Sequence, residues 1–330
     1  MADYKTIHGT TIKSYTTDPD NLIQGQVWYD KTNKVLQFQG QGPGAWSTSG
    51  NLNQGRNALS GAGTNNATGL AFGGTPSPGG ALTELYNGSS WTEVGDLNLG
   101  RYGIGGLGTA TAAIAAGGAP PNTAASETWN GSSWTEGSDI NNLRYVLSGA
   151  GFSTAGIVAG GWGPGGHPGI SANVELYNGS SWTETTDLNT ARAYASFGGT
   201  STSSVFAGGS NPGPPAFLSF TETWNGSSWT ETSNLNEARY NIGGTGTSNT
   251  DALAFGGQPG GAGTGKTEQW NGSGWTEIAD LSTGRVAMAS SGNTTTAALA
   301  AGGEDPSSAA LTATEEWNDP TLLIKTVDTD

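Results

Sequence analysis

The stretch Tyr86-Asn87-Gly88-Ser89-Ser90-Trp91 recurs along this chain with few changes, and Arg101 follows its tryptophan by ten residues. All six arginines of the sequence stand ten residues after a tryptophan, at intervals of 43 to 48 residues. A glycine pair begins 16 or 17 residues after each arginine, and an aromatic residue followed by Asn comes later in each interval. A repeat of this length is typical of a propeller or a solenoid.

Two of these marks recur six times in the same order. The arginines are Arg56, Arg101, Arg144, Arg192, Arg239 and Arg285, and the tryptophans are Trp46, Trp91, Trp134, Trp182, Trp229 and Trp275. We interpret the tryptophans as blade-packing residues, because an indole buries more apolar area than most other side chains.

One repeat reads as four short strands, over residues 102–108, 111–116, 126–129 and 134–140. The second of them is small and apolar throughout, as expected for a strand buried on both faces. Between the third and fourth, Asn130-Gly131 predicts a type I′ turn. No segment shows helical periodicity. Each repeat is therefore predicted to be a four-stranded antiparallel sheet.

The order of arginine, glycine pair, aromatic strand and tryptophan resembles the kelch motif from about Trp46 to Asn318. That resemblance implies a β-propeller. We predict an all-β chain: a six-bladed kelch-like β-propeller with an N-terminal β-hairpin extension. Kelch propellers mostly bind partners, so the resemblance implies binding rather than chemistry.

Ring closure follows from counting strands. The last repeat lacks its outer strand, whereas residues 46–52 are an outer strand with no repeat before them. Pairing the two would leave no exposed edge between the first and last blades. The alternative is that the tail, Thr321 to Val327, fills this position. We predict an extension over 1–44, a propeller over 45–318 and a tail over 319–330.

The segment from Gln24 to Phe38 carries a second resemblance, to a Gly-Gln-x-Trp-Tyr hairpin of virion and tail proteins of tailed bacteriophages, marine ones especially. It implies a virion protein, assembled in the host cytoplasm. Residues 1–44 would then bind other virion proteins, in many copies or as a homo-oligomer, and the propeller would bind a host-surface glycan.

The arginines allow two interpretations. A glutamate stands two residues before the Asn of each repeat, so six Arg–Glu ion pairs within or between blades are expected. Alternatively, the arginines form a cationic ring at the channel mouth that holds an acidic ligand. The glutamates are Glu84, Glu127, Glu175, Glu222, Glu268 and Glu315.

The loops after the glycine pairs differ from repeat to repeat and would lie on one face. Variable loops on a rigid scaffold are a common place for binding. Their unrepeated residues Trp162, His167, Phe217 and Phe220 are the candidate ligand-binding residues. The alternative is that these Pro-rich loops only cover the face.

Composition narrows the function classes. With 12 basic and 27 acidic residues, the formal net charge is −15, and between Val35 and Gly265 the only cations are the repeat arginines. Nucleic-acid binding is not expected. The chain has no cysteine and two histidines, so we predict no metal site and no cofactor. The sequence has no apolar run long enough to predict a membrane-spanning helix, so membrane insertion is not expected.

We therefore predict a non-enzymatic bacteriophage virion structural protein: a tail, tail-fibre or surface-decorating protein. One alternative is a bacterial kelch-type scaffold for protein complexes. A third possibility is a carbohydrate-active enzyme, for which the unrepeated acids include Asp251, Glu304 and Asp305.

Overall fold

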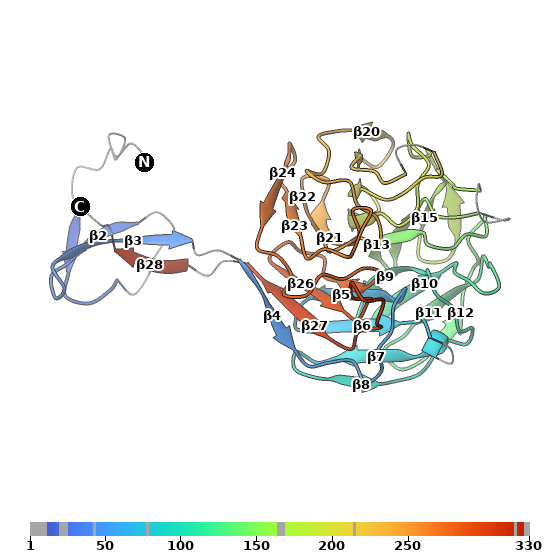
Figure 1. The fold of residues 1–330 in the computed structure, drawn as a ribbon, viewed down its shortest axis with the longest axis horizontal. Helices are drawn as coiled ribbons and strands as arrows, with labels where there is room; N and C mark the ends of the chain where they lie inside the picture. Colours follow the sequence, from blue (N-terminus) through green and yellow to red (C-terminus); the bar gives the residue numbers. More distant parts are fainter. Residues whose placement is uncertain are drawn as a thin grey trace. The chain divides into compact units, whose positions relative to one another are not determined.

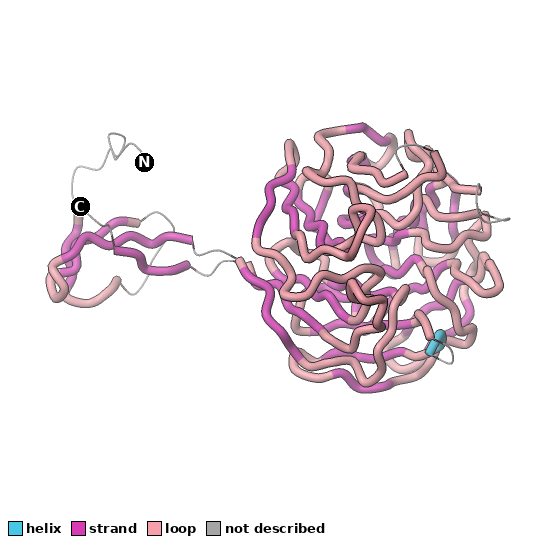
Figure 2. Tube along the Cα trace, viewed as in Figure 1, coloured by secondary structure: helices cyan, strands magenta, loops and turns pink. Residues whose placement is uncertain are grey.

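The computed structural model describes residues 12–19, 26–41, 44–76, 79–163, 169–213, 216–319 and 322–326. Over these ranges the only helical element is one 3-10 turn, η2 (Gly79–Ala81), and all other elements are β-strands (Figure 2). None of the described helices is long and apolar enough to cross a membrane. The chain divides into two compact units, Ala45–Asn318 and the combination of Met1–Gly44 with Asp319–Asp330.

The larger unit contains six four-stranded antiparallel sheets, numbered here in chain order from the first after β4. The first sheet contains β5 (Ser60–Asn65), β6 (Thr68–Phe72), β7 (Thr83–Tyr86) and β8 (Trp91–Glu93), and the second contains β9 (Gly105–Thr109), β10 (Ala112–Ala116), β11 (Ser126–Trp129) and β12 (Trp134–Glu136). The third contains β13 (Ser148–Phe152), β14 (Ala155–Ala159), β15 (Val174–Tyr177) and β16 (Trp182–Glu184), and the fourth contains β17 (Ser196–Thr200), β18 (Ser203–Ala207), β19 (Thr221–Trp224) and β20 (Trp229–Glu231). The fifth contains β21 (Gly243–Ser248), β22 (Asp251–Phe255), β23 (Thr267–Trp270) and β24 (Trp275–Ile278), and the sixth contains β25 (Ala289–Ser291), β26 (Ala297–Ala301), β27 (Thr314–Asn318) and β4 (Ala45–Ser49).

The first strands of the six sheets surround a common axis. β5 contacts β9, β9 contacts β13, and the series continues through β17, β21 and β25 back to β5. In Figure 1 the fourth strands, such as β8, β12, β20 and β24, lie at the rim of this unit. The predicted all-β propeller architecture is confirmed.

The last sheet takes its fourth strand from the other end of the sequence. β4 pairs antiparallel with β27, and Trp46 lies opposite Trp317. The tail does not fill this position, because β28 (Leu322–Thr326) pairs with β3 (Val35–Gln41) instead. The alternative in which Thr321 to Val327 closes the ring is therefore wrong.

The smaller unit is a four-stranded sheet in the order β1-β2-β3-β28. The predicted hairpin corresponds to β2 (Val27–Asp30) and β3, and β1 (Lys13–Tyr15) adds to it in parallel. Extension and tail, expected as separate segments, thus share one sheet. Trp28 is fully buried in this unit, and the Asp30 carboxylate accepts hydrogen bonds from Thr32 and Asn33 in the turn between β2 and β3.

Hydrophobic clusters fill the spaces between neighbouring sheets of the propeller. One cluster joins Phe72 and Leu70 of the first sheet to Ala113, Ala115 and Trp134 of the second. Four of the five side chains of β10 are buried, as its sequence predicted, and Ala112 is half-buried. Close packing of small and large residues across each sheet interface is what holds the ring together.

The turn between the third and fourth strands differs from its prediction. Four residues, Asn130 to Ser133, separate Trp129 from Trp134, and among them only Gly131 has a positive φ, of 95°. A type I′ turn needs positive φ at both central residues, so that prediction is wrong. Instead, the Asn130 side-chain oxygen accepts hydrogen bonds from the backbone N–H groups of Ser132 and Ser133. Asn thus folds the loop through its side chain.

The repeat tryptophans connect neighbouring sheets. Trp134 of the second sheet donates its indole N–H to the Thr83 hydroxyl of the first sheet, at 2.9 Å. Trp91 makes the same bond to Thr314 of the sixth sheet at 2.9 Å. Five of the six repeat tryptophans are buried, and Trp46 is half-buried. At these interfaces the indole therefore contributes buried apolar area and also one hydrogen bond to a Thr hydroxyl of the neighbouring sheet.

The glycine pairs stand where one sheet passes close to the next. The Gly74 N–H donates to the Arg101 carbonyl at 3.0 Å, and the equivalent bonds continue to Gly303, which donates to Arg56 at 2.8 Å. Gly73 has a φ of 72°, and a Cβ placed on it would lie 2.7 Å from the Arg101 carbonyl oxygen. Only glycine permits both the left-handed backbone and this approach.

Inside each sheet, the repeat arginine is buried against a glutamate of the third strand. Arg56 donates to Glu84 at 2.8 Å and to the carbonyls of Gly73 and Leu82. The second carboxylate oxygen of Glu84 accepts from both the backbone N–H and the side-chain amide of Asn53. The guanidinium thus ties the loop that enters a sheet to its second and third strands.

The sixth sheet lacks one part of this arrangement. Five sheets have Asn three residues before the arginine, and its amide also donates to the carbonyl of the repeat tryptophan, as Asn141 does to Trp182. The sixth has Ser282, whose backbone N–H alone reaches Glu315. The closing strand β4, which carries Trp46, therefore lacks a side-chain clamp that the other fourth strands have.

We expect Trp91→Ala to lower the free energy of unfolding by about 3–5 kcal/mol, because it opens a cavity between the sixth and first sheets and frees Thr314. Urea unfolding followed by tryptophan fluorescence measures this. The control is Tyr29→Ala, which alters an exposed aromatic residue of the smaller unit. A loss no larger than that of the control would contradict the packing role.

We expect Ser282→Asn to raise the free energy of unfolding by about 1 kcal/mol, because the new amide would donate to Glu315 and to the Trp46 carbonyl. Asn141→Ser is the matched reverse change and should lower it by a similar amount. Urea unfolding of both variants measures these changes. If Ser282→Asn is no more stable than the wild type, the missing clamp does not weaken the closing strand.

Candidate binding site on the propeller axis

The axis of the propeller is lined by residues that follow the arginines directly. In each repeat the second residue after the arginine has a left-handed backbone, with φ between 51° and 62°. Five of these six residues are not glycine, and one of them, Val146, is β-branched, so the conformation is strained. The six are Ala58, Gly103, Val146, Tyr194, Asn241 and Ala287, and we call them the axial belt.

The axial belt is a closed ring of backbone hydrogen bonds. Each residue donates its N–H to the carbonyl of the belt residue in the preceding sheet, and Ala58 donates to Ala287, which closes the ring. The six N···O distances run from 2.6 to 3.4 Å. The ring leaves no belt N–H free to bind an anion, and it compensates for the strained backbone of residues such as Val146.

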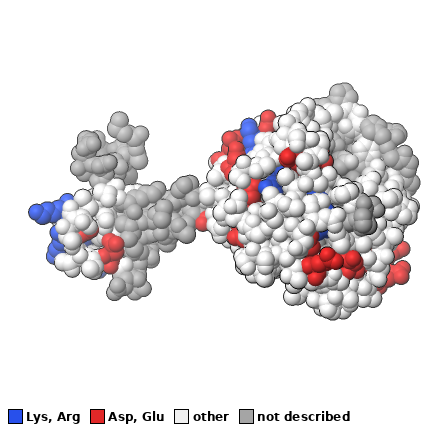
Figure 3. Space-filling view, turned by 60° about the horizontal axis from the view of Figure 1, so that its bottom comes forward, with Lys and Arg blue, Asp and Glu red and all other residues white. Residues whose placement is uncertain are grey.

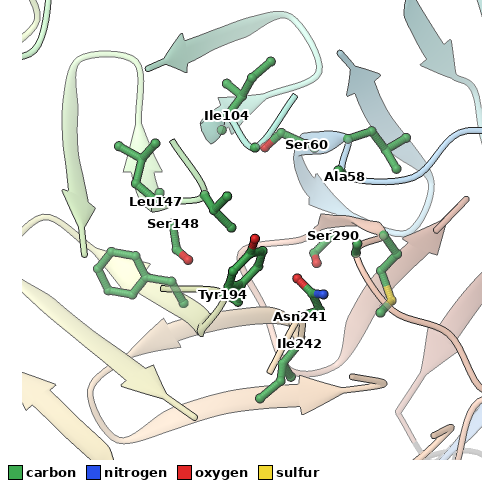
Figure 4. A pocket seen from close by; sticks show the side chains of 18 of the residues that line it. Ala58, Ser60, Ile104, Leu147, Ser148, Tyr194, Asn241, Ile242 and Ser290 are labelled. Carbon is green, nitrogen blue, oxygen red and sulfur yellow. The ribbon is translucent and has the colours of Figure 1, made fainter. Parts of the chain in front are cut away.

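A cavity of about 190 Å³ lies inside this ring, between the belt and the first strands. The side chains of Tyr194, Asn241, Ser148 and Ser290 surround it (Figure 4), and Tyr102 also lines it. The described lining includes no Asp, Glu, Lys, Arg or His. The cavity thus combines hydroxyl and amide groups with apolar walls and carries no charge.

The polar groups of the cavity are neutral hydrogen-bond donors and acceptors near pH 7. Burial, followed by the nearby Tyr145, Tyr102 and Tyr240, raises the pKa of Tyr194 to about 12, so its hydroxyl stays protonated. Within the described part of the chain, the Tyr194 hydroxyl and the Asn241 side-chain amide make no hydrogen bond to a protein group. These two groups are available to a ligand.

The variable loops border the mouth of this cavity. The residue after each arginine forms a bridge with the residue after the glycine pair, as Tyr102 does with Ala119 and Tyr240 with Gln258. The predicted loop face and the cavity therefore belong to the same end of the propeller. Phe217 joins this face through its ring, which stacks on Tyr240 with centroids 4.9 Å apart and planes 6° apart.

The predicted ligand-binding residues have different positions. Trp162 is buried, with 9% of its surface exposed, so its ring offers little area to a ligand. Phe217 and Phe220 are half-buried, and Phe217 is already stacked on a tyrosine. His167 lies outside the described residues. None of the three described residues lines the axial cavity.

The arginines do not form a cationic ring. Each guanidinium is buried, with at most 1% of the residue exposed, and contacts the glutamate of its own sheet. No arginine lines the cavity, because the side chains point into the sheets while the chain continues to the belt. The interpretation as a ligand-binding channel ring is therefore wrong.

The ion pairs are held in their charged form by the surrounding hydrogen bonds. Burial by itself raises the pKa of Glu127, but hydrogen bonds from Arg101 and Asn98 outweigh it and hold that pKa below its ordinary value. Burial lowers the pKa of Arg144, although Glu175 opposes the shift. The Glu127 carboxylate is thus stabilised in its charged form by its hydrogen bonds, and the Arg144 guanidinium is partly compensated for its lost hydration by Glu175.

Sequence reasoning missed the residues that line the cavity. Tyr102, Tyr194 and Asn241 occupy the two positions after an arginine, where the six repeats differ. That variation next to an invariant residue was the available signal. The shared left-handed backbone was not predictable, because Ala, Val and Tyr rarely adopt it.

Acidic residues lie on the outside of the propeller. The fourth strands β8, β12, β16, β20 and β24 each expose a glutamate. On the face in Figure 3, uncharged residues cover most of the surface and the acidic residues gather in patches. A ligand that approaches the cavity thus meets neutral walls on a negatively charged protein.

Comparisons with known proteins support the fold alone. No protein-family profile matches the chain, and no curated protein sequence is significantly similar to it. A solved structure titled "Structure of YjhT" is similar with a TM-score of 0.67, over 83% of this chain and 99% of that one. The sequence identity is 12%, so the similarity supports the propeller fold and says nothing about activity.

We expect Arg144→Ala to lower the free energy of unfolding by about 3–5 kcal/mol, because it leaves the buried Glu175 carboxylate without its cation. Lys266→Ala is the control, since its ion pairs with Glu237 and Glu277 are 3.5 and 3.7 Å long and exposed; such pairs contribute about 0–1 kcal/mol. Thermal and urea unfolding compare the two, and an unchanged melting temperature for Arg144→Ala would refute the structural role.

Proposed function

We propose that this chain is a non-enzymatic structural protein of a bacteriophage virion, built as a six-bladed kelch-type propeller. Its loop face would bind a host-surface glycan or another virion protein. The observation that carries the binding proposal is the neutral axial cavity at the end of the propeller where the variable loops gather. Rigid scaffolds commonly present their binding groups in this way.

The smaller unit supports a role in attachment. The propeller closes with β4, so its ring is complete without β1, β2, β3 or β28. Those strands form a sheet of their own from both ends of the chain. Together with the hairpin resemblance to phage virion proteins, this favours the smaller unit as the part that binds neighbouring virion proteins.

The positions of the carboxylates favour binding over hydrolysis. The repeated glutamates are occupied by the arginines. Among the unrepeated acids, Asp251 accepts hydrogen bonds from Thr295, Glu304 from Asn57, and Asp305 from its own loop. A glycosidase needs two carboxyl groups that face one substrate, and the described lining of the cavity supplies none.

Mass spectrometry of gradient-purified particles of the encoding phage tests the virion proposal, and peptides of this chain should co-purify with the particles. A variant reduced to residues 45–318 should keep the propeller, judged by its near-UV circular dichroism, but be absent from particles. The full-length Lys266→Ala protein, changed at an exposed ion pair outside the cavity, is the control and should be incorporated. Particles that lack the wild-type chain would overturn the proposal, and incorporation of the shortened variant would overturn the attachment role.

A further inference from the structure

We infer that the axial cavity binds one uncharged six-membered polyol ring, such as the terminal neutral pyranose of a glycan. This inference rests on the proposed binding function and names the class of ligand and the groups that recognise it. Three properties of the cavity support it: its size, its lack of charge and its available polar groups.

The size of the cavity limits the ligand to a single ring. Cavities for drug-sized ligands span about 300–1,000 Å³, whereas a cavity of about 150 Å³ holds one benzene molecule. At about 190 Å³, the axial cavity has room for one six-membered ring with some substituents. The rest of a glycan would leave through the mouth, between the loops.

The lack of charge selects a neutral ligand. The nearest repeated cations are the buried arginines, and each is already paired with a glutamate of its own sheet. All six belt N–H groups donate within the belt, so the backbone offers no anion site there. A carboxylate in the cavity would be desolvated without a partner, on a chain of net charge −15.

The available groups match the hydroxyls of a sugar. Tyr194 lies among Ser148, Asn241 and Ser290 in the cavity (Figure 4). Its hydroxyl and the Asn241 amide supply donors and acceptors that no described protein group uses, and Ser60 adds another hydroxyl. The apolar wall, with Ile104, Leu147 and Ile242, suits the C–H faces of a pyranose. Apolar walls with a few convergent polar groups are typical of small-molecule sites.

Saturation-transfer NMR and calorimetry on the full-length protein test this inference with the methyl glycosides of glucose, galactose, mannose and N-acetylglucosamine. Methyl glucuronide is the matched acidic probe, since it differs from methyl glucoside by its carboxylate. At least one neutral glycoside should bind, and the glucuronide should bind at least about tenfold more weakly.

Two variants locate the binding. Tyr194→Phe removes one hydroxyl, and Asn241→Ala places in the belt a residue that Ala58 and Ala287 already show to be compatible with this backbone. Each should weaken binding by about three- to tenfold. Tyr29→Phe, which removes a hydroxyl from an exposed tyrosine of the smaller unit, should leave binding unchanged.

The inference is overturned if no neutral glycoside binds at millimolar concentration, if the glucuronide binds equally well, or if both cavity variants bind like the wild type with unchanged melting temperatures. These outcomes are separate from the particle test. Sugar binding by a chain absent from particles would refute the virion proposal only, and incorporation of a chain that binds no sugar would refute the inference only.

Discussion

The structure depends on where one arginine per repeat can be placed. Its guanidinium must lie inside the sheet, because the carboxylate of its partner and the carbonyls at the ends of two strands are there, as for Arg144 with Glu175, Gly160 and Asn173. Its own backbone carbonyl then accepts a hydrogen bond from the glycine pair of the preceding sheet, as Arg144 does from Gly118. Two residues later the chain reaches the axial belt. A single residue therefore connects the strands within its sheet, bonds that sheet to its neighbour and directly precedes the backbone that surrounds the cavity.

A buried ion pair is a costly way to hold a fold, because two desolvated charges recover their hydration energy only when every remaining polar atom is bonded. Here the carboxylates meet that condition, whereas the buried Nε atoms of Arg56, Arg192 and Arg239 have no hydrogen-bond partner among the described residues. The Glu84 carboxylate accepts from Arg56 with one oxygen and from Asn53 with the other. An apolar pair of equal volume would lose these directional bonds between segments that have few apolar atoms of their own. In chains so rich in glycine and so poor in large aliphatic residues, directional bonds replace part of the specificity that packing supplies elsewhere.

Much of the propeller could be predicted from the sequence, because repetition turns weak local signals into strong ones. The closing strand followed from a repeat that lacked its last part, and β4 pairs with β27 as that count required. The loop at Asn130 differs from its prediction, because Asn-Gly is typical of a two-residue turn whereas the side-chain bonds of Asn130 favour a four-residue loop. The sheet shared by β3 and β28 depends on a pairing between the two ends of the chain, which no local pattern encodes. The cavity was missed because its residues share a position and a backbone conformation but no side-chain type.

A shared backbone position with variable side chains allows a repetitive chain to carry a specific site. Hydrogen bonds of the axial belt involve only backbone atoms, so the ring closes equally well with Ala58, Tyr194 or Asn241 at its positions. The side chains there are consequently free to vary without a loss of closure, whereas the arginine two residues before each of them is not. The backbone of the belt is thus symmetric although the side chains that line the cavity differ. Tyr194 and Asn241 lie next to each other on neighbouring sheets, because each belt residue is hydrogen-bonded to the next. A propeller held by side chains around its axis would have fewer residues left with which to recognise anything.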